Sequence, residues 1–240
     1  MTTTHFVLVP GNWLGAWAWD RVTAPLQAGG HQVTAVTLPG LTPTATDRGS
    51  ITLSEHLDAL ADVVSHVGPD AVLVAHSGAG KNVSGVLDRD PASVRRVIYV
   101  DSGPAATGLA DDLPPEWPEL PLPSWDEFAA QGSSLEGLSP EDLAEFAARA
   151  VPHPAGPLRE PIVLQHDEAR RAVPTTIVAC SISSTVVDDL AHQGHPMFAE
   201  VAQLVDLTYL DLPTGHWPMW SRPVDLADAL MRSVTSGARV

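Results

Sequence analysis

Residues 72–80 read Val72-Leu73-Val74-Ala75-His76-Ser77-Gly78-Ala79-Gly80. The residues before His76 are apolar and include β-branched side chains, which is typical of a buried strand. Small residues follow Ser77, at a place where large side chains would prevent a tight turn. The pattern predicts a strand, a sharp turn with Ser77 at its apex, and a helix that begins directly afterwards.

Short apolar runs alternate with segments of helical periodicity along most of the chain. We expect strands at residues 6–9, 32–38, 71–75, 94–100, 173–180 and 205–212, and helices around 17–26, 53–64, 83–87, 197–204 and 223–234. Near-continuous apolar strands that alternate with helices are typical of a mostly parallel sheet covered by helices on both faces. In such an α/β fold, ligands bind beyond the carboxyl ends of the strands. The residues that follow Val9, Val74 and Val100 are therefore the first candidates for a site.

The alternation stops between residues 103 and 172. Five prolines lie between positions 114 and 123, close to Trp117 and Trp125. Ser139-Pro140-Glu141 then predicts the start of a helix, because proline is favoured at the first helical position. Long segments without regular structure are uncommon in compact domains unless they serve a function. We predict a small helical lid at residues 103–172, inserted into one α/β core formed by residues 1–102 and 173–240.

The chain of 240 residues carries 13 Lys and Arg against 29 Asp and Glu, a formal net charge of −16. Such an acidic chain argues against binding to nucleic acid or to an anionic membrane, which requires Lys and Arg. Cys180 is the only cysteine, so no disulfide forms within the chain. The first residues do not resemble a signal peptide, and no segment has the roughly 20 apolar residues of a membrane span. These features predict a cytoplasmic protein, a monomer or homodimer, whose partner is a small-molecule substrate.

Ser77 needs a base to act as a nucleophile, because a serine hydroxyl alone is weakly nucleophilic. His216 follows the last expected strand and therefore reaches the same edge of the sheet. The amides of Gly78, at the start of the helix, and of Asn12, after the first strand, are placed to bind an oxyanion. Gly11 lets the backbone turn close to the substrate. Together these residues predict nucleophilic attack on an acyl carbon.

Two further residues near the turn have plain structural interpretations. We expect His76 to pack behind the turn, and Lys81 to lie on a solvated face of the helix. No group of His, Cys, Asp or Glu has metal-ligand spacing, and the glycines of the turn match neither phosphate-binding pattern. The sequence therefore predicts no metal and no cofactor.

The amino-terminal part of the chain resembles a known group. Phe6-Val7-Leu8-Val9-Pro10-Gly11-Asn12-Trp13-Leu14-Gly15-Ala16-Trp17-Ala18-Trp19 is similar to the opening of the plant methylesterase and hydroxynitrile lyase group of α/β-hydrolases. Ala75-His76-Ser77 and Gly215-His216 resemble the nucleophile and base of that group. The turn is a nucleophile elbow that has alanine, at Ala75 and Ala79, where the motif has glycine. The resemblance covers most of the chain outside the lid and implies an α/β-hydrolase fold.

Two departures from the group bear on the reaction. Pro10-Gly11 stands where the group usually has His followed by Gly, Thr or Asn, and the lyases carry Thr or Asn at the position of Gly11. The lyases also often have Lys after the catalytic histidine, where this chain has Trp217. These departures argue against a cyanohydrin lyase.

Two aspartates are candidates for the acid of the triad. The group usually places the acid in the loop after the strand that here ends at Cys180, but this loop has no carboxylate before Asp188. Asp101 directly follows the strand after the elbow, where haloalkane dehalogenases and zearalenone lactonases carry their acid. We favour Asp101, in a lactonase-like position, and keep Asp188 as the alternative. A simple capping role for Asp101 in its own turn also stays open.

The tryptophans suggest a hydrophobic or aromatic pocket, although several could simply fill the core. The candidate substrate contacts are Gly11, Trp13, Trp117, Trp125 and Trp217. We predict a serine hydrolase that cleaves an ester or lactone of a hydrophobic small molecule through an acyl-enzyme. One alternative is a receptor that binds a small molecule with little turnover. The other is a lyase or cofactor-free oxygenase that uses His216 as a base.

Overall fold

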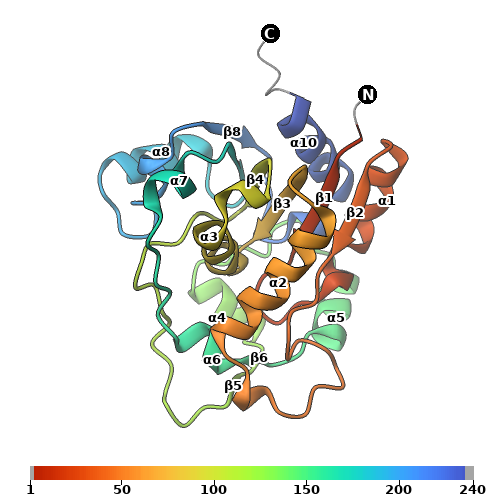
Figure 1. Cartoon of the computed structure of the whole chain (residues 1–240). Helices are drawn as coiled ribbons and strands as arrows, with labels where there is room; N and C mark the ends of the chain where they lie inside the picture. Colours follow the sequence, from red (N-terminus) through yellow and green to blue (C-terminus); the bar gives the residue numbers. More distant parts are fainter. Residues whose placement is uncertain (1–2, 236–240) are drawn as a thin grey trace.

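A six-stranded sheet forms the centre of the molecule (Figure 1). The computed structural model describes residues 3–235. The strands are β1 (His5–Val9), β2 (Gln32–Ala35), β3 (Ala71–His76), β4 (Arg96–Val100), β7 (Thr175–Ala179) and β8 (Leu207–Asp211). They lie in the order β2-β1-β3-β4-β7-β8, and each neighbouring pair is parallel. This topology confirms the predicted α/β class.

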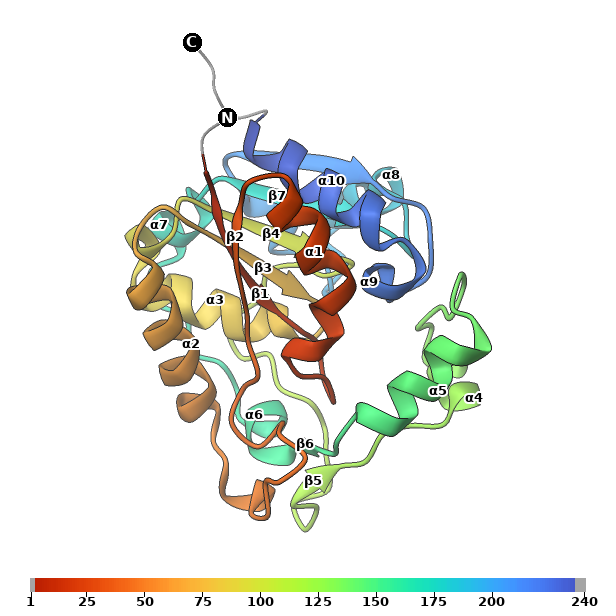
Figure 2. The same ribbon diagram turned by 90° about the vertical axis from the view of Figure 1, so that its right-hand side faces the viewer.

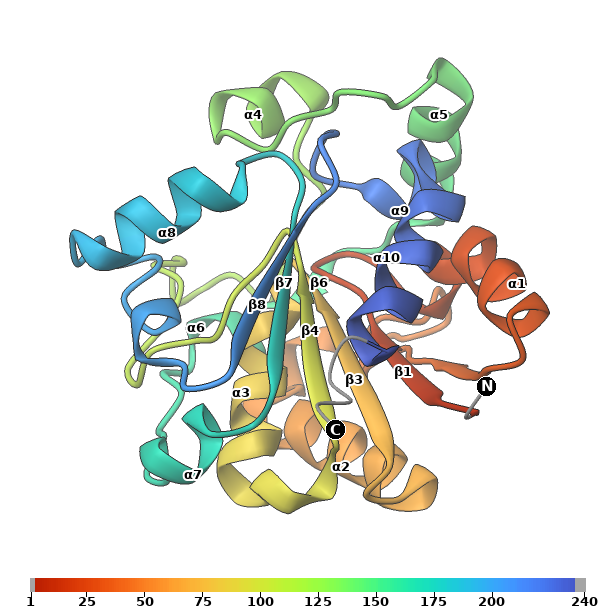
Figure 3. The ribbon, with the colours of Figure 1, turned by 90° about the horizontal axis from the view of Figure 1, so that it is seen from above.

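Helices cover both faces of the sheet (Figure 2), (Figure 3). On one face α1 (Asp20–Ala28) packs against α10 (Pro223–Thr235), and on the other α2 (Leu53–Val67) packs against α3 (Ala79–Arg89). The remaining helices of the core are α8 (Ser184–His192), α9 (Pro218–Ser221) and the 3-10 turns η1 (Ala16–Trp19), η2 (Arg48–Ser50), η3 (Pro91–Ser93) and η4 (Val201–Gln203). Within residues 3–235, no helix combines the length and the apolar character that crossing a membrane requires.

Alternate residues of each strand enter two separate cores, one on each face. In β1, Val7 and Val9 pack in the core that contains α2 and α3, whereas Phe6 and Leu8 pack in the core that contains α1 and α10. Every residue of β3 is buried. A strand covered on both faces has no solvated side, which explains its continuous apolar sequence.

The region after β7 differs from the sequence-based expectation. The helix predicted at 197–204 is only the 3-10 turn η4, and the true helix is α8, earlier in the chain. The Ser183 hydroxyl accepts a hydrogen bond from the Val186 amide and caps the start of α8. Gly194, in the left-handed conformation with φ 74°, follows its end. A capping serine and a terminal glycine were therefore the signals of this helix.

Most of the short elements formed by residues 103–172 gather beyond the carboxyl ends of the strands (Figure 2). The elements are β5 (Glu119–Leu120), β6 (His153–Pro154), α4 (Trp125–Ala130), α5 (Pro140–Arg149), α6 (Ala155–Arg159) and α7 (Asp167–Arg171). β5 and β6 pair as a two-stranded antiparallel sheet. The helix α5 begins at Pro140, as predicted, with Ser139 as its cap. α7 instead lies against α3, and the exact limits of the lid stay a prediction.

The expectation for Lys81 is wrong. Its Nζ atom donates to the carbonyl oxygens of Pro157, Leu158 and Glu160, at 2.9, 3.0 and 2.7 Å. Burial lowers the pKa of Lys81. The side chain therefore satisfies carbonyl groups of α6 and its end, and it ties this part of the lid to α3.

Candidate active site

Ser77 lies at the turn between β3 and α3. Its φ of 51° is in the left-handed region, which a residue with a side chain adopts only where the surroundings enforce it. The Ser102 hydroxyl donates to the Ser77 carbonyl oxygen at 2.6 Å and holds the turn. Gly80 permits this close packing, because a Cβ there would lie 2.3 Å from the carbonyl oxygen of Gly103. The turn thus fixes Ser77 between the strand and the helix.

His216 lies in the loop after β8 and contacts Ser77. Its Nε2 atom is 2.8 Å from Ser77 Oγ, and its Nδ1 atom is 2.5 Å from Asp101 Oδ2. With Nδ1–H donating to the carboxylate, Nε2 is free to accept the proton of the serine hydroxyl. The structure therefore brings together three residues that follow β3, β4 and β8.

Asp101 is bound from several sides. The amides of Cys180 and Ser181 donate to Oδ1 at 3.2 and 2.9 Å, and the Ser181 hydroxyl donates to Oδ2 at 2.6 Å. Burial by itself raises the pKa of a carboxyl group, but the hydrogen bonds from His216 and Ser181 outweigh it and hold the pKa of Asp101 below its usual value. Asp101 is therefore an ionised and oriented partner for His216.

Asp188 lies on α8, away from His216. The Tyr209 hydroxyl donates to its Oδ1 at 3.2 Å, and His192, one turn along the same helix, approaches its other oxygen at 3.5 Å. Of the two candidate acids, the structure places only Asp101 against the histidine.

The loop after β1 passes very close to Ser77. A Cβ on Gly11 would lie 2.9 Å from Ser77 Cβ, so only glycine fits without displacement. The side chain of Asn12 lies over Gly78, where a Cβ would be 2.6 Å from Asn12 Oδ1. Within residues 3–235, the backbone N–H groups of Asn12 and Gly78 have no hydrogen-bond acceptor. Two free amides beside a serine are the donors that an oxyanion hole requires.

A cavity of about 170 Å³ opens onto these residues. Its walls include the residues predicted around the nucleophile, namely Gly11, Asn12, Trp13, Ser77, His216 and Trp217. His76 also lines it, and three lid residues complete it, namely Phe128, Gln131 and Ser133. The aromatic walls contact one another, since the rings of Phe128 lie 5.3 Å from Trp13 and 5.2 Å from Trp217.

Two predicted substrate contacts do not line this cavity. Trp117 is 40% exposed on the lid surface, and Trp125 packs against Phe128 and Phe146. Sequence reasoning missed Phe128 and its neighbours because their place over the site depends on how the lid folds. The position of Phe128 on the apolar side of a short helix was the only available signal.

His76 is fully buried beside His216, which agrees with its expected packing role. Its Nε2–H donates to the His216 carbonyl oxygen at 2.7 Å. Burial, and secondly the neighbouring His216, lowers the pKa of His76 to about 3. The ring therefore stays neutral and supports the backbone of the histidine loop.

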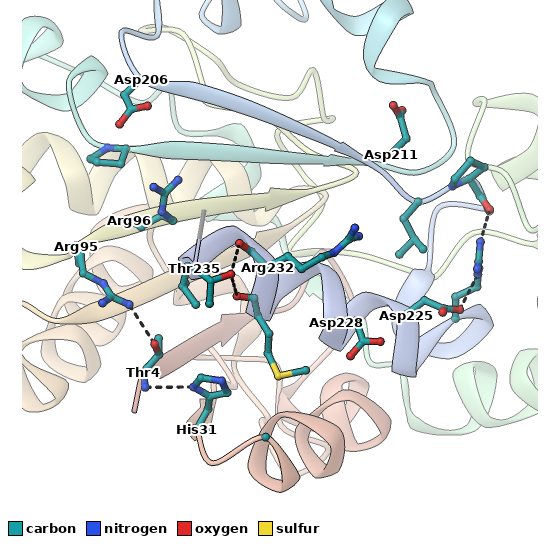
Figure 4. A pocket seen from close by; sticks show the side chains of 17 residues that line it. Thr4, His31, Arg95, Arg96, Asp206, Asp211, Asp225, Asp228, Arg232 and Thr235 are labelled. Atoms are coloured by element: carbon teal, nitrogen blue, oxygen red, sulfur yellow. Dashed lines mark hydrogen bonds and ion pairs between the residues drawn. The ribbon is translucent and has the colours of Figure 1, made fainter. Parts of the chain in front are cut away.

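A larger cavity of about 1260 Å³ lies between β8 and α10 (Figure 4). Charges of both signs face it, among them Arg95, Arg96, Asp206 and Asp228. Ser77 and His216 do not line it. The volume of a cavity therefore does not identify the candidate active site in this molecule. The smaller cavity is the candidate because a possible nucleophile and a possible base line it.

Comparison with known families agrees with this geometry. The model of the alpha/beta hydrolase family matches residues 6–229. The chain belongs to the alpha/beta hydrolase family. The match spans the sheet, the elbow and the histidine loop of this hydrolase.

Curated relatives and solved structures narrow the group. This hydrolase is 31% identical over 256 residues to Methylesterase 7 of Arabidopsis thaliana, covering 94% of each chain. It is 34% identical over 120 residues to a carbendazim hydrolyzing esterase of Nocardioides sp. (strain SG-4G), covering 47% of this chain and 50% of that one. The crystal structure of a methylesterase protein from Arabidopsis has a TM-score of 0.73 at 23% identity, covering 98% of this chain and 100% of that one. The resemblance to the methylesterase group is confirmed, and these relatives support an enzyme of the carboxylic ester hydrolase class.

Proposed function

We propose that this protein is a serine hydrolase that cleaves a carboxylic ester or lactone through an acyl-enzyme. The observation that carries the proposal is the series of contacts from Asp101 through His216 to Ser77, at 2.5 and 2.8 Å. A serine hydroxyl becomes nucleophilic when an adjacent imidazole accepts its proton, and a buried carboxylate stabilises the imidazolium. The esterase relatives support the same class of reaction.

In the proposed reaction, Ser77 Oγ attacks the acyl carbon while its proton moves to His216 Nε2. The carbonyl oxygen becomes an oxyanion that accepts hydrogen bonds from the Asn12 and Gly78 amides. The tetrahedral intermediate then collapses, and the departing alcohol oxygen takes the proton from His216. Water attacks the acyl-enzyme with His216 again as the base, and release of the acid restores Ser77.

The cavity limits the substrate that we propose. Trp13, Phe128 and Trp217 provide aromatic walls that favour a hydrophobic or aromatic group. A volume of about 170 Å³ lies below the roughly 300–1,000 Å³ of pockets for drug-sized ligands. The cavity therefore suits one part of a small ester or lactone, with the rest reaching toward solvent. A cytoplasmic location and a monomeric or homodimeric state stay predictions.

The test is steady-state hydrolysis of a panel of chromogenic esters and aryl lactones by the wild type and by Ser77→Ala. We expect turnover of at least one substrate and a loss of roughly 10⁶-fold in the variant, the scale for removal of a triad serine. Ser54→Ala, the same change on an exposed turn of α2, serves as the control and should retain full activity.

Two outcomes would contradict the proposal. Turnover that survives Ser77→Ala would exclude Ser77 as the nucleophile and favour a reaction in which His216 acts as base. Binding of panel members by the wild type without any turnover would favour the receptor.

A further inference from the structure

Trp13 has an unusual backbone conformation beside the oxyanion hole. Its φ of 65° places a bulky residue in the left-handed region, where such residues are true outliers. Strain of this kind persists only where neighbouring groups enforce it. Trp13 directly follows Asn12, so the groups that hold Trp13 fix the peptide next to the one that carries the Asn12 N–H.

Three hydrogen bonds from the lid hold Trp13. Its backbone N–H donates to Nδ1 of His153 at 3.2 Å, and its carbonyl oxygen accepts from the Val151 amide at 3.1 Å. Its indole N–H donates to the Leu120 carbonyl oxygen at 3.0 Å. His153 is the partner that acts through its side chain, so it is the contact that a substitution can remove.

The surroundings of His153 suit it to accept this hydrogen bond. The residue is 3% exposed, and its ring meets the ring of His56 edge to face at 5.7 Å. His56 is itself fixed, because its Nε2–H donates to the Pro39 carbonyl oxygen at 2.9 Å. Burial, with His56 and Lys81 nearby, lowers the pKa of His153 to about 3. The neutral ring keeps the Nδ1 lone pair that the Trp13 amide needs.

We propose that His153, in the lid, is a positioning residue of the oxyanion hole: it fixes the peptide between Asn12 and Trp13, and this holds the preceding peptide, which carries the Asn12 N–H, where the oxyanion develops. The inference rests on the proposed function. His153 does not line the cavity and so acts on the reaction only through Trp13. Without the acceptor, the Trp13 amide would be buried without a partner, and the loop would relax from its strained conformation.

A misplaced oxyanion donor weakens binding of the transition state but not of the ground state. We therefore expect His153→Leu to lower kcat about 10- to 100-fold with little change in KM, since complete removal of one donor lowers kcat about 10²- to 10³-fold. His153→Asn, which keeps an acceptor oxygen near the position of Nδ1, should recover most of kcat. Ile162→Ala is the control, because it removes a buried lid side chain (1% exposed) that belongs to the core on the α2 and α3 side, whereas Trp13 packs against the other core.

The variants are compared on the best ester of the panel, beside wild type and Ser77→Ala, with the melting temperature of each. Equal losses of kcat in His153→Leu, His153→Asn and Ile162→Ala would overturn the positioning role, because they would indicate a general effect of lid packing. Unchanged kcat in a folded His153→Leu would also overturn the positioning role. In that case, turnover by the wild type that is lost in Ser77→Ala would still support the proposed function.

A second measurement applies if His153→Leu does not fold. Hydrogen exchange of the Trp13 amide, measured by NMR, should then be faster in His153→Gln than in His153→Asn. Equal exchange in the two variants would overturn the positioning role.

Discussion

The two sides of the candidate active site are built by different means. Ser77, Asp101 and His216 each follow a strand of one parallel sheet, so the pairing of the strands places them at a common edge. Phe128 and Ser133 come from a six-residue helix and the turn after it, and their position depends on local packing in the lid. The order of the strands therefore places the candidate catalytic groups, whereas the packing of residues 103–172 sets the shape of the cavity around them.

Backbone hydrogen bonds join the two sides. The His216 amide donates to the Ser134 carbonyl oxygen at 2.7 Å, and the Gly215 amide donates to the Glu136 carbonyl oxygen at 3.1 Å. With the contact between Trp13 and the segment around His153, the lid supports the loops after β1 and β8. Segments from residues 103–172 are therefore a structural part of the candidate active site. Substitutions on the sheet side and on the lid side measure how much each contributes to activity.

After the loss of the nucleophile itself, the largest expected effect comes from the sheet side, in Asp101→Asn. An amide in place of the carboxylate no longer stabilises the imidazolium and favours the wrong tautomer of His216, so kcat should fall about 10⁴-fold. Asp188→Asn is the matched control and should stay within about twofold of wild type, because Asp188 contacts Tyr209 instead. The measurement is steady-state hydrolysis of the best ester by both variants. A larger loss of activity in Asp188→Asn than in Asp101→Asn would instead assign the triad acid to Asp188 on α8.

A smaller effect is expected where the two sides meet, in Gly215→Ala. A Cβ there would lie 2.5 Å from the Glu136 carbonyl oxygen and 2.6 Å from that of Ser134, so the histidine loop and the lid must separate. Overpacking of this kind destabilises by about 1–3 kcal/mol, and the displaced histidine should lower kcat/KM by about tenfold or more. Activity assays and urea unfolding measure the two effects.

Gly103→Ala is the control for this substitution. Its new Cβ would lie 3.6 Å from Val201, an ordinary contact distance, so stability and activity should change little. Equal behaviour of the two variants would mean that the histidine loop does not depend on the lid.

A third test uses pH to measure the effect of the buried histidines on stability. Burial lowers the pKa of His56 to about 4 and of His76 and His153 to about 3. Well above pH 6.5 these rings are neutral in both the folded and the unfolded state and add no pH dependence. As the pH falls below 6.5, the unfolded chain takes up protons that the folded chain does not, so the free energy of unfolding decreases. Each histidine contributes up to roughly 1.4 kcal/mol per pH unit.

Urea unfolding between pH 7.5 and 5 measures this slope, in a range above the titration of most carboxyl groups. His56→Gln should reduce the slope by the share of one histidine. A slope near zero in the wild type would show that the buried rings take up protons in the folded state.

The strands that Ser77, Asp101 and His216 follow could be predicted from the sequence, because the signals of a buried strand are periodic and local. The apolar run before Ser77, and the position of His216 after the last strand, follow from strand order alone. Asp101 is favoured over Asp188 by topology, because it directly follows the strand after the elbow. The packing of the lid depends on residues that are distant in the sequence, such as the carbonyl groups that Lys81 binds. Local sequence patterns do not predict such contacts.

The smallest expected effect is that of Trp117→Ala, a substitution on the outer surface of the lid. Trp117 is 40% exposed, whereas Trp217 is 3% exposed and lines the cavity with its ring 4.9 Å from that of His216. Surface substitutions usually change stability by no more than about 0.5 kcal/mol, and we expect kcat/KM of Trp117→Ala to stay within about twofold of wild type. Trp217→Ala on the same ester is the contrast and should lower it clearly. A rise in KM of tenfold for Trp117→Ala would mean that the substrate extends from the cavity across β5, so that the lid surface, and not only its inner wall, selects the substrate.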